Sequence, residues 1–148
     1  MSIKDFKYYW RYNDEKYAVF SKQELSTISV IPKDEVRKSW MRICEKEKFQ
    51  ESAYINDIVH HSAPVLIKDC QWGENEDRTR ETFEVFFSGL NVDKISIYYD
   101  CENGLQLPIN VFCTRWSDFC YPSDLILILL PSMMIVYYED IAYGPYRI

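Results

Sequence analysis

Residues 94–109 read KISIYYDCENGLQLPI, and this stretch decides the fold class. Its first half alternates in polarity with a period of two, so Ile95, Ile97 and Tyr99 share one face of a strand. The Asn-Gly pair in its middle is a strong hairpin signal, and the apolar residues after it supply the partner strand. The sequence therefore predicts an antiparallel hairpin here.

Three further extended segments follow this hairpin toward the C-terminus. Residues 125–130 are apolar on both faces, which is typical of a central strand covered on both sides. After a Pro-Ser turn, residues 133–139 are predicted to be the next antiparallel strand. Residues 143–146 are expected to end the chain as an edge strand.

Helical patterns dominate the N-terminal half. Ser21 and Glu24 form an S-x-x-E capping box that opens a short helix. A longer helix is expected from Pro32, with an apolar stripe of Val36, Trp40 and Ile43. Residues 51–61 are ambiguous but suit a helix. Residues 63–67 look extended, and their proline argues against a central strand.

Two more helices are expected around the hairpin. Residues 73–77 read as a polar, acidic loop, after which Thr79 caps a helix with apolar positions at Phe83 and Phe87. Asn110 is expected to cap a second helix that carries Arg115. Together these elements predict a single α+β domain over residues 1–148. Its antiparallel sheet has four or five strands, mostly from the C-terminal half, with helices packed on one face.

Charge is distributed unevenly along the chain. Residues 1–72 carry 12 Lys and Arg against 11 Asp and Glu, a net charge of +1, whereas residues 73–148 carry 5 against 12, a net charge of −7. Such an acidic half attracts cations and basic partners, and it repels nucleic acid and anionic lipid. Because 16% of the residues are aromatic, tyrosine and tryptophan are available for a core and for an interface.

The sequence lacks the motifs that are typical of several classes of function. The chain has no GxSxG, P-loop, GxGxxG or DxDxDG pattern, no basic stripe for nucleic acid and no targeting or membrane segment. Its five cysteines show no metal or disulfide spacing, so reduced thiols in the cytosol are expected. We therefore expect a cytoplasmic protein that is not an enzyme and holds no metal or cofactor.

Few residues have the types needed for chemistry. Asp57 and His61 are four residues apart, but with His60 they are too few and badly placed for a metal site. Cys113 has no base near it in the sequence. Arg115 is interpreted as a structural arginine paired with a carboxylate, in preference to an anion ligand.

Three short segments resemble known bacterial families. Residues 31–40, IPKDEVRKSW, are similar to a helix of the immunity proteins of bacterial toxin systems, including contact-dependent growth inhibition. Residues 110–119, NVFCTRWSDF, and 10–14, WRYND, resemble an uncharacterised family of small bacterial proteins. The first resemblance implies a cytosolic protein that neutralises one cognate toxin, often a basic nuclease, by binding over or beside its active site.

The leading hypothesis is a binding protein that neutralises a basic protein toxin domain through its acidic half. The residues expected to bind the partner are Glu74, Glu76, Asp77, Glu102, Glu139 and Asp140, with Tyr138 as an aromatic anchor. The first alternative is a small enzyme or ligand-binding domain, in which at least two of Arg115, His60, His61 and Cys113 converge in a deep pocket. The second alternative is a subunit of a larger complex or a homodimer.

Overall fold

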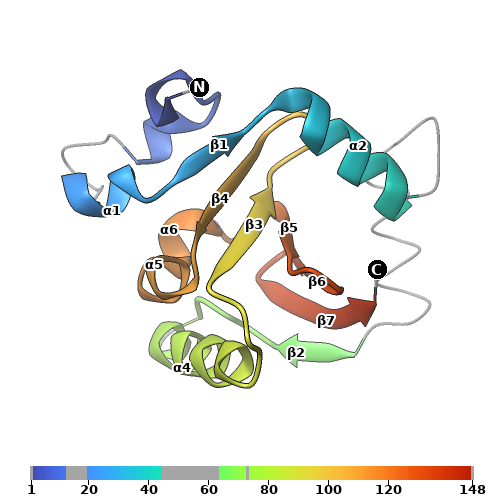
Figure 1. Cartoon of the computed structure of the whole chain (residues 1–148). Coiled ribbons are helices and arrows are strands. Elements are labelled where there is room, and N and C mark those ends of the chain that lie inside the picture. Colours follow the sequence, from blue (N-terminus) through green and yellow to red (C-terminus); the bar gives the residue numbers. More distant parts are fainter. Residues whose placement is uncertain (1, 13–19, 45–63, 73, 148) are drawn as a thin grey trace.

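The computed structural model describes residues 2–12, 20–44, 64–72 and 74–147. In these ranges seven strands form one antiparallel sheet in the order β1-β4-β3-β5-β6-β7-β2 (Figure 1). The strands are β1 (Ser29–Ile31), β2 (Val65–Ile67), β3 (Lys94–Tyr98), β4 (Gly104–Pro108), β5 (Leu125–Leu129), β6 (Met133–Tyr138) and β7 (Ile141–Arg147). The predicted α+β class with an antiparallel sheet is confirmed.

The predicted number of strands, four or five, is wrong. Both edge strands, β1 and β2, come from the N-terminal half and have three residues each. Such short segments show too few positions for an alternating pattern to stand out. Because β2 pairs with β7, β7 is an inner strand and not the predicted edge.

The predicted hairpin of β3 and β4 is confirmed, with Lys94 opposite Pro108 and Tyr98 opposite Gly104. Its turn differs from the expected Asn-Gly type, because no residue of the connection has a positive φ. The Asp100 carboxylate instead accepts the backbone N–H groups of Glu102 and Asn103, each at 2.8 Å. Glycine is needed at Gly104 because a Cβ there would lie 2.6 Å from the Tyr98 ring.

The sheet is buried on both faces at its centre. In β5, Ile126 and Ile128 belong to one hydrophobic cluster, whereas Leu127 and Leu129 belong to a second cluster on the opposite face. The prediction that this segment is a central, covered strand is therefore confirmed. Strands of this kind need a cover on each face.

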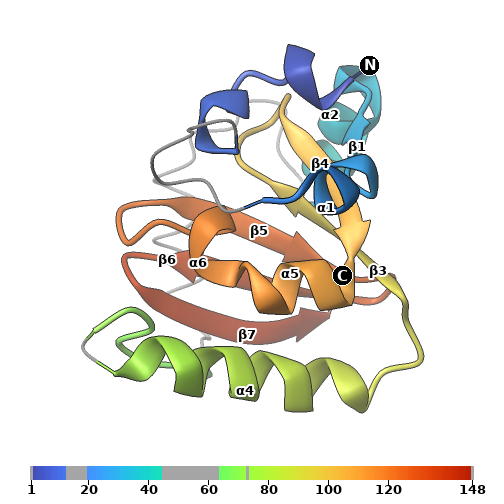
Figure 2. The same cartoon turned by 90° about the vertical axis from the view of Figure 1, so that its left-hand side faces the viewer.

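Helices provide the two covers. The helices are α1 (Lys22–Ser26), α2 (Lys33–Cys44), α4 (Asn75–Ser88), α5 (Ile109–Thr114) and α6 (Trp116–Phe119), and short 3₁₀ helices occur at η1 (Ile3–Asp5) and η2 (Tyr9–Arg11). Phe83 of α4, Phe112 of α5 and Trp116 of α6 pack on the first face. Val36 and Trp40 of α2 pack on the second face (Figures 1 and 2). The prediction that helices cover one face only is wrong.

The first two predicted helices are confirmed. At α1, Ser21 and Glu24 form the expected capping box, and the backbone N–H of each donates to the side chain of the other at 3.0 Å. The α2 helix follows Pro32 directly, and its stripe residues Val36 and Trp40 are buried. The ambiguous segment 51–61 lies outside the described residues.

Two helix starts differ from the prediction. Residues 74–77 are the N-cap and first turn of α4, and not a loop, because carboxylates are favourable at the positive end of the helix dipole. Thr79 is inside this helix and buried, where its hydroxyl donates to the Cys70 carbonyl at 2.9 Å. The predicted cap Asn110 is also wrong, because α5 already begins at Ile109.

Candidate functional site

The antiparallel register brings many loops to one end of the sheet. Tyr98, the last residue of β3, pairs with Gly104 at the start of β4. At the same end, Tyr138 of β6 pairs with the first residues of both β5 and β7. The end of β2 joins them, because Ile67 pairs with Ala142. Figure 2 shows these connections toward the left of the molecule.

We call this end the acidic end. It is made of the β3–β4 hairpin (100–103), the loop before β5 (121–124), the end of β6 with the β6–β7 turn (138–140), the connection after β2 (68–72) and the start of α4 (74–77). It contains all of the residues that the sequence predicted to bind a partner, namely Glu74, Glu76, Asp77, Glu102, Tyr138, Glu139 and Asp140. The fold thus gathers side chains that are up to 66 positions apart.

These carboxylates differ in whether they form ion pairs or hydrogen bonds with other residues of the protein. Glu102 binds Arg37 of α2 at 2.5 Å, and this contact lowers the pKa of Glu102. Glu76 accepts the Ser117 hydroxyl at 2.6 Å. Glu74 and Glu139 are exposed, so their negative charge faces solvent. The charge of Glu139 also raises the pKa of the neighbouring Tyr138 phenol.

The turn between β6 and β7 consists of two acidic residues in a left-handed conformation. Glu139 has φ 48° and Asp140 has φ 64°, between the paired residues Tyr138 and Ile141. Asparagine and glycine are the usual residues in such a two-residue turn. Asp140 has a structural role, since its carboxylate accepts the backbone N–H of Gln71 at 2.9 Å. The Glu139 side chain instead interacts with the neighbouring Tyr138 phenol.

Two exposed tryptophans lie at the same end, and neither is among the residues that the sequence predicted to bind a partner. The side chain of Trp72, after β2, is 77% exposed, and that of Trp10, in η2, is 60% exposed. Trp10 lies beside Tyr121, with ring centroids 6.2 Å apart. The predicted anchor Tyr138 is instead half-buried against the second hydrophobic cluster. Residue type alone does not reveal exposure, so the sequence held no signal that separated Trp10 and Trp72 from the buried Trp40 and Trp116.

A buried ion pair ties the N-terminal segment to this end. The Arg11 guanidinium binds both carboxylate oxygens of Asp124, at 2.5 and 2.7 Å, and it lies over the Tyr121 ring at 4.3 Å. Burial lowers the pKa of Arg11, but the bonds to Asp124 and the nearby tyrosines outweigh it and leave this pKa raised. Arg11 therefore keeps its charge, and the pair fixes Trp10 next to the β5 loop.

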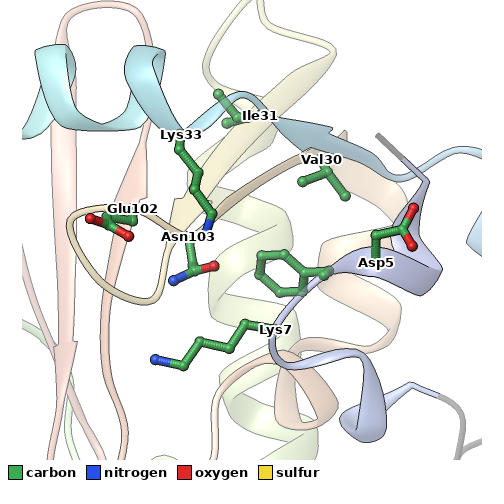
Figure 3. A pocket seen from close by; sticks show the side chains of 8 residues that line it. Asp5, Lys7, Val30, Ile31, Lys33, Glu102 and Asn103 are labelled. Atoms are coloured by element: carbon green, nitrogen blue, oxygen red, sulfur yellow. The ribbon is translucent and has the colours of Figure 1, made fainter.

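A small pocket opens between the N-terminal segment, β1 and the β3–β4 hairpin (Figure 3). Its volume is about 120 Å³, and Lys7, Lys33 and Glu102 are among its lining residues. In Figure 3 the Lys33 side chain extends toward Asn103, and the Lys7 side chain lies below them. Small-molecule sites usually have volumes of ~300–1,000 Å³, so this pocket suits a single side chain of a partner better than a substrate.

The candidate chemical residues are held in structural roles where they are described. Arg115 donates to both carboxylate oxygens of Glu24 at 3.0 and 3.1 Å, as its structural interpretation predicted. Cys113 is 97% buried, and burial followed by the charge of Glu84 raises its pKa to about 12, so its sulfur is a protonated thiol. His60 and His61 lie outside the described residues.

Comparisons with protein-family models, with curated proteins and with solved structures found no match to this chain. The resemblance to immunity proteins therefore stays a prediction. Over the ranges that the structure describes, no helix is long and apolar enough to cross a membrane. Within the same ranges, no group of three or more His, Cys, Asp or Glu residues could hold a metal ion.

Proposed function

We propose that this protein is an immunity-type inhibitor that binds a basic protein toxin through the acidic end of its sheet. One observation carries the proposal: exposed carboxylates and exposed tryptophans from distant parts of the sequence meet at this end. Complementary charge speeds the encounter of two proteins, and buried aromatic anchors supply much of the affinity of an interface.

The acidic end combines side chains that are bonded within the protein with side chains that are exposed to solvent, and this combination supports a binding surface. Partly buried contacts such as Arg11–Asp124 and Asp140–Gln71 hold the loops in place. Glu74, Glu139 and Trp72 stay exposed on this fixed framework. A framework that is already ordered loses little conformational entropy on binding.

The test is protection of growth. Each basic toxin domain that the genes flanking the gene of this chain encode is expressed in the same cells with the wild-type protein or with a variant that combines Trp72→Ala and Glu139→Gln. We expect the wild type to restore growth and the variant to fail, although both proteins fold. A matched control, Val85→Ala with Glu81→Gln, changes an exposed apolar residue and an exposed carboxylate of α4 away from the acidic end, and it should still protect.

Two results would reject the proposal. One is the absence of protection together with the absence of binding between the purified protein and the toxin domain. The other is protection that the acidic-end variant retains in full. Sedimentation at micromolar concentration tests the alternative of a homodimer, because a dimer formed through the exposed tryptophans would dissociate in the Trp72→Ala variant.

A further inference from the structure

A groove on the helical layer lies away from the acidic end. It runs between the last turns of α4, the segment that leads into β3, and α5, and its volume is about 510 Å³. Its apolar lining comes from Phe87, Leu90, Val92, Ile109 and Cys113. A volume of this size is within the usual range of ligand sites, so the groove has room for more than one side chain.

The charge of the groove has one sign. Glu84 and Asp93 are exposed, and among the described residues of the lining they are the charged ones, with no lysine or arginine. Arg80, which is not part of this lining, lies 3.9 Å from Glu84. Lys94 lines a different hollow together with Arg42, Ser96 and Tyr98. At the floor of the groove, burial and then the negative charge of Glu84 raise the pKa of the Cys113 thiol. An apolar floor whose charged lining residues are acidic favours a ligand that is both apolar and cationic.

The groove is separate from the surface assigned to the toxin. Asp93 precedes Lys94, which pairs with Pro108 at the far end of the β3–β4 hairpin from Glu102. Binding in the groove therefore does not depend on the proposed function. Because the groove is open to solvent and the polar residues Ser88, Asn110 and Thr114 belong to its lining, it suits an extended chain better than an enclosed small molecule.

We propose that this groove binds a basic peptide segment of a protein partner. An apolar side chain of the segment lies on the floor formed by Phe87, Leu90 and Ile109. Lysine or arginine residues on either side of it bind Glu84 and Asp93. The side chains of Asn110 and Thr114 can form hydrogen bonds with the backbone of the segment, because amide and hydroxyl groups both donate and accept hydrogen bonds.

The probe is the synthetic peptide Gly-Lys-Leu-Lys-Gly, added to the ¹⁵N-labelled full chain at about 1 mM, where weak binding is measurable by NMR. We expect amide shifts at Ser88, Leu90, Asn110 and Thr114. The peptide Gly-Glu-Leu-Glu-Gly should produce none, because its charges repel the groove. The peptide Gly-Lys-Ser-Lys-Gly should bind more weakly, because serine offers the floor little apolar area.

Variants make the assignment specific. Glu84→Gln with Asp93→Asn should weaken binding of Gly-Lys-Leu-Lys-Gly about fivefold, whereas Glu81→Gln, on the same helix but outside the lining, should leave it unchanged. Thr114→Trp, which fills the open edge, should abolish it. Absence of shifts, shifts confined to the acidic end, or equal binding of the acidic peptide would overturn the proposal, and none of these results depends on a toxin.

Discussion

At the scale of single residues, the pair of Arg11 and Asp124 shows how this protein uses charge inside its fold. Both side chains are largely buried, with 7% and 14% exposure. Asp124 also accepts the backbone N–H of Tyr121 at 2.7 Å, so one carboxylate organises the loop before β5. Removal of one partner leaves a charge without its counter-charge in a desolvated site.

Asp124→Asn should therefore lower the free energy of unfolding by about 3 kcal/mol in urea titrations. The control is Glu84→Gln, which removes an exposed carboxylate 3.9 Å from Arg80 and should cost less than ~0.5 kcal/mol. Replacement of both partners by apolar residues, Arg11→Met with Asp124→Leu, should recover much of the loss. If the double variant is as unstable as the single one, the loop geometry matters more than the charge.

Trp72 should be a residue of the interface and not of the core. Because its side chain is 77% exposed, Trp72→Ala should change the free energy of unfolding by less than ~0.5 kcal/mol. The same change should weaken binding of the toxin domain at least about tenfold, as at other aromatic hot spots. Titration calorimetry measures the affinity. Trp40→Ala is the contrasting variant, because Trp40 is 2% exposed and its loss should unfold the protein.

At the scale of elements, the β6–β7 turn keeps glutamate where asparagine would fit the backbone better. A residue with a Cβ in the left-handed region is destabilised by roughly 1 kcal/mol, and asparagine tolerates this region more readily. Glu139 nevertheless occupies it, at φ 48°. The strain places an exposed carboxylate at the acidic end, which is understandable if this carboxylate serves a partner.

Glu139→Asn should accordingly raise the free energy of unfolding by about 0.5–1 kcal/mol. Glu139→Gln is its matched control, because it removes the charge but keeps a long side chain in the left-handed conformation, and its stability should equal that of the wild type. Both variants should bind the toxin domain more slowly. Stabilisation by both variants to the same extent would mean that charge repulsion, and not backbone strain, acts in this turn.

The helices and strands also show how much of the fold could be predicted from the sequence. Regular patterns predicted the hairpin of β3 and β4, the covered strand β5 and the helix after Pro32. The extended, non-central segment predicted at 63–67 agrees with the edge strand β2, whereas β1 was not predicted because its three residues carry no periodicity. The start of α4 differs from the predicted loop because a run of acids is typical both of a solvated loop and of a first helical turn. Contacts with distant segments, such as those of Thr79 with Cys70 and of Glu76 with Trp116 and Ser117, stabilise the helix.

For the candidate site, the sequence supplied the acidic residues but not their proximity. Glu102 and Glu139 were proposed from charge alone, and the antiparallel register is what brings their loops to one end. The exposed positions of Trp10 and Trp72 follow from packing between distant segments, which no local pattern encodes. Long-range pairing therefore carries most of the information about this site.

At the scale of the whole molecule, the position of the charge should matter more than its total. The chain has a net charge of −6, and five of the eleven exposed Asp and Glu residues in the described ranges lie at the acidic end. A field concentrated over the contact surface orients an oppositely charged partner before contact. A uniform charge would speed the encounter but would not favour one orientation.

Two variants with the same change in net charge distinguish an effect of the position of the charge from an effect of its total. Glu74→Gln with Glu139→Gln removes two negative charges from the acidic end, whereas Asn91→Lys with Ser132→Lys adds two positive charges at exposed positions at the opposite end. Neutral glutamine is chosen at Glu74 because lysine at the start of α4 would oppose the helix dipole. Association with the toxin domain is followed by stopped-flow fluorescence at several salt concentrations.

We expect the first variant to associate several-fold more slowly than the wild type at low salt, and the second to stay within about twofold of it. The difference should shrink near physiological ionic strength, where the Debye length falls to ~8 Å. Dissociation should change less in both variants, because charges inside a desolvated contact are screened less than those at its rim. Equal slowing by both variants would show that total charge is sufficient, and rates independent of salt would remove electrostatic steering as the reason for the acidic end.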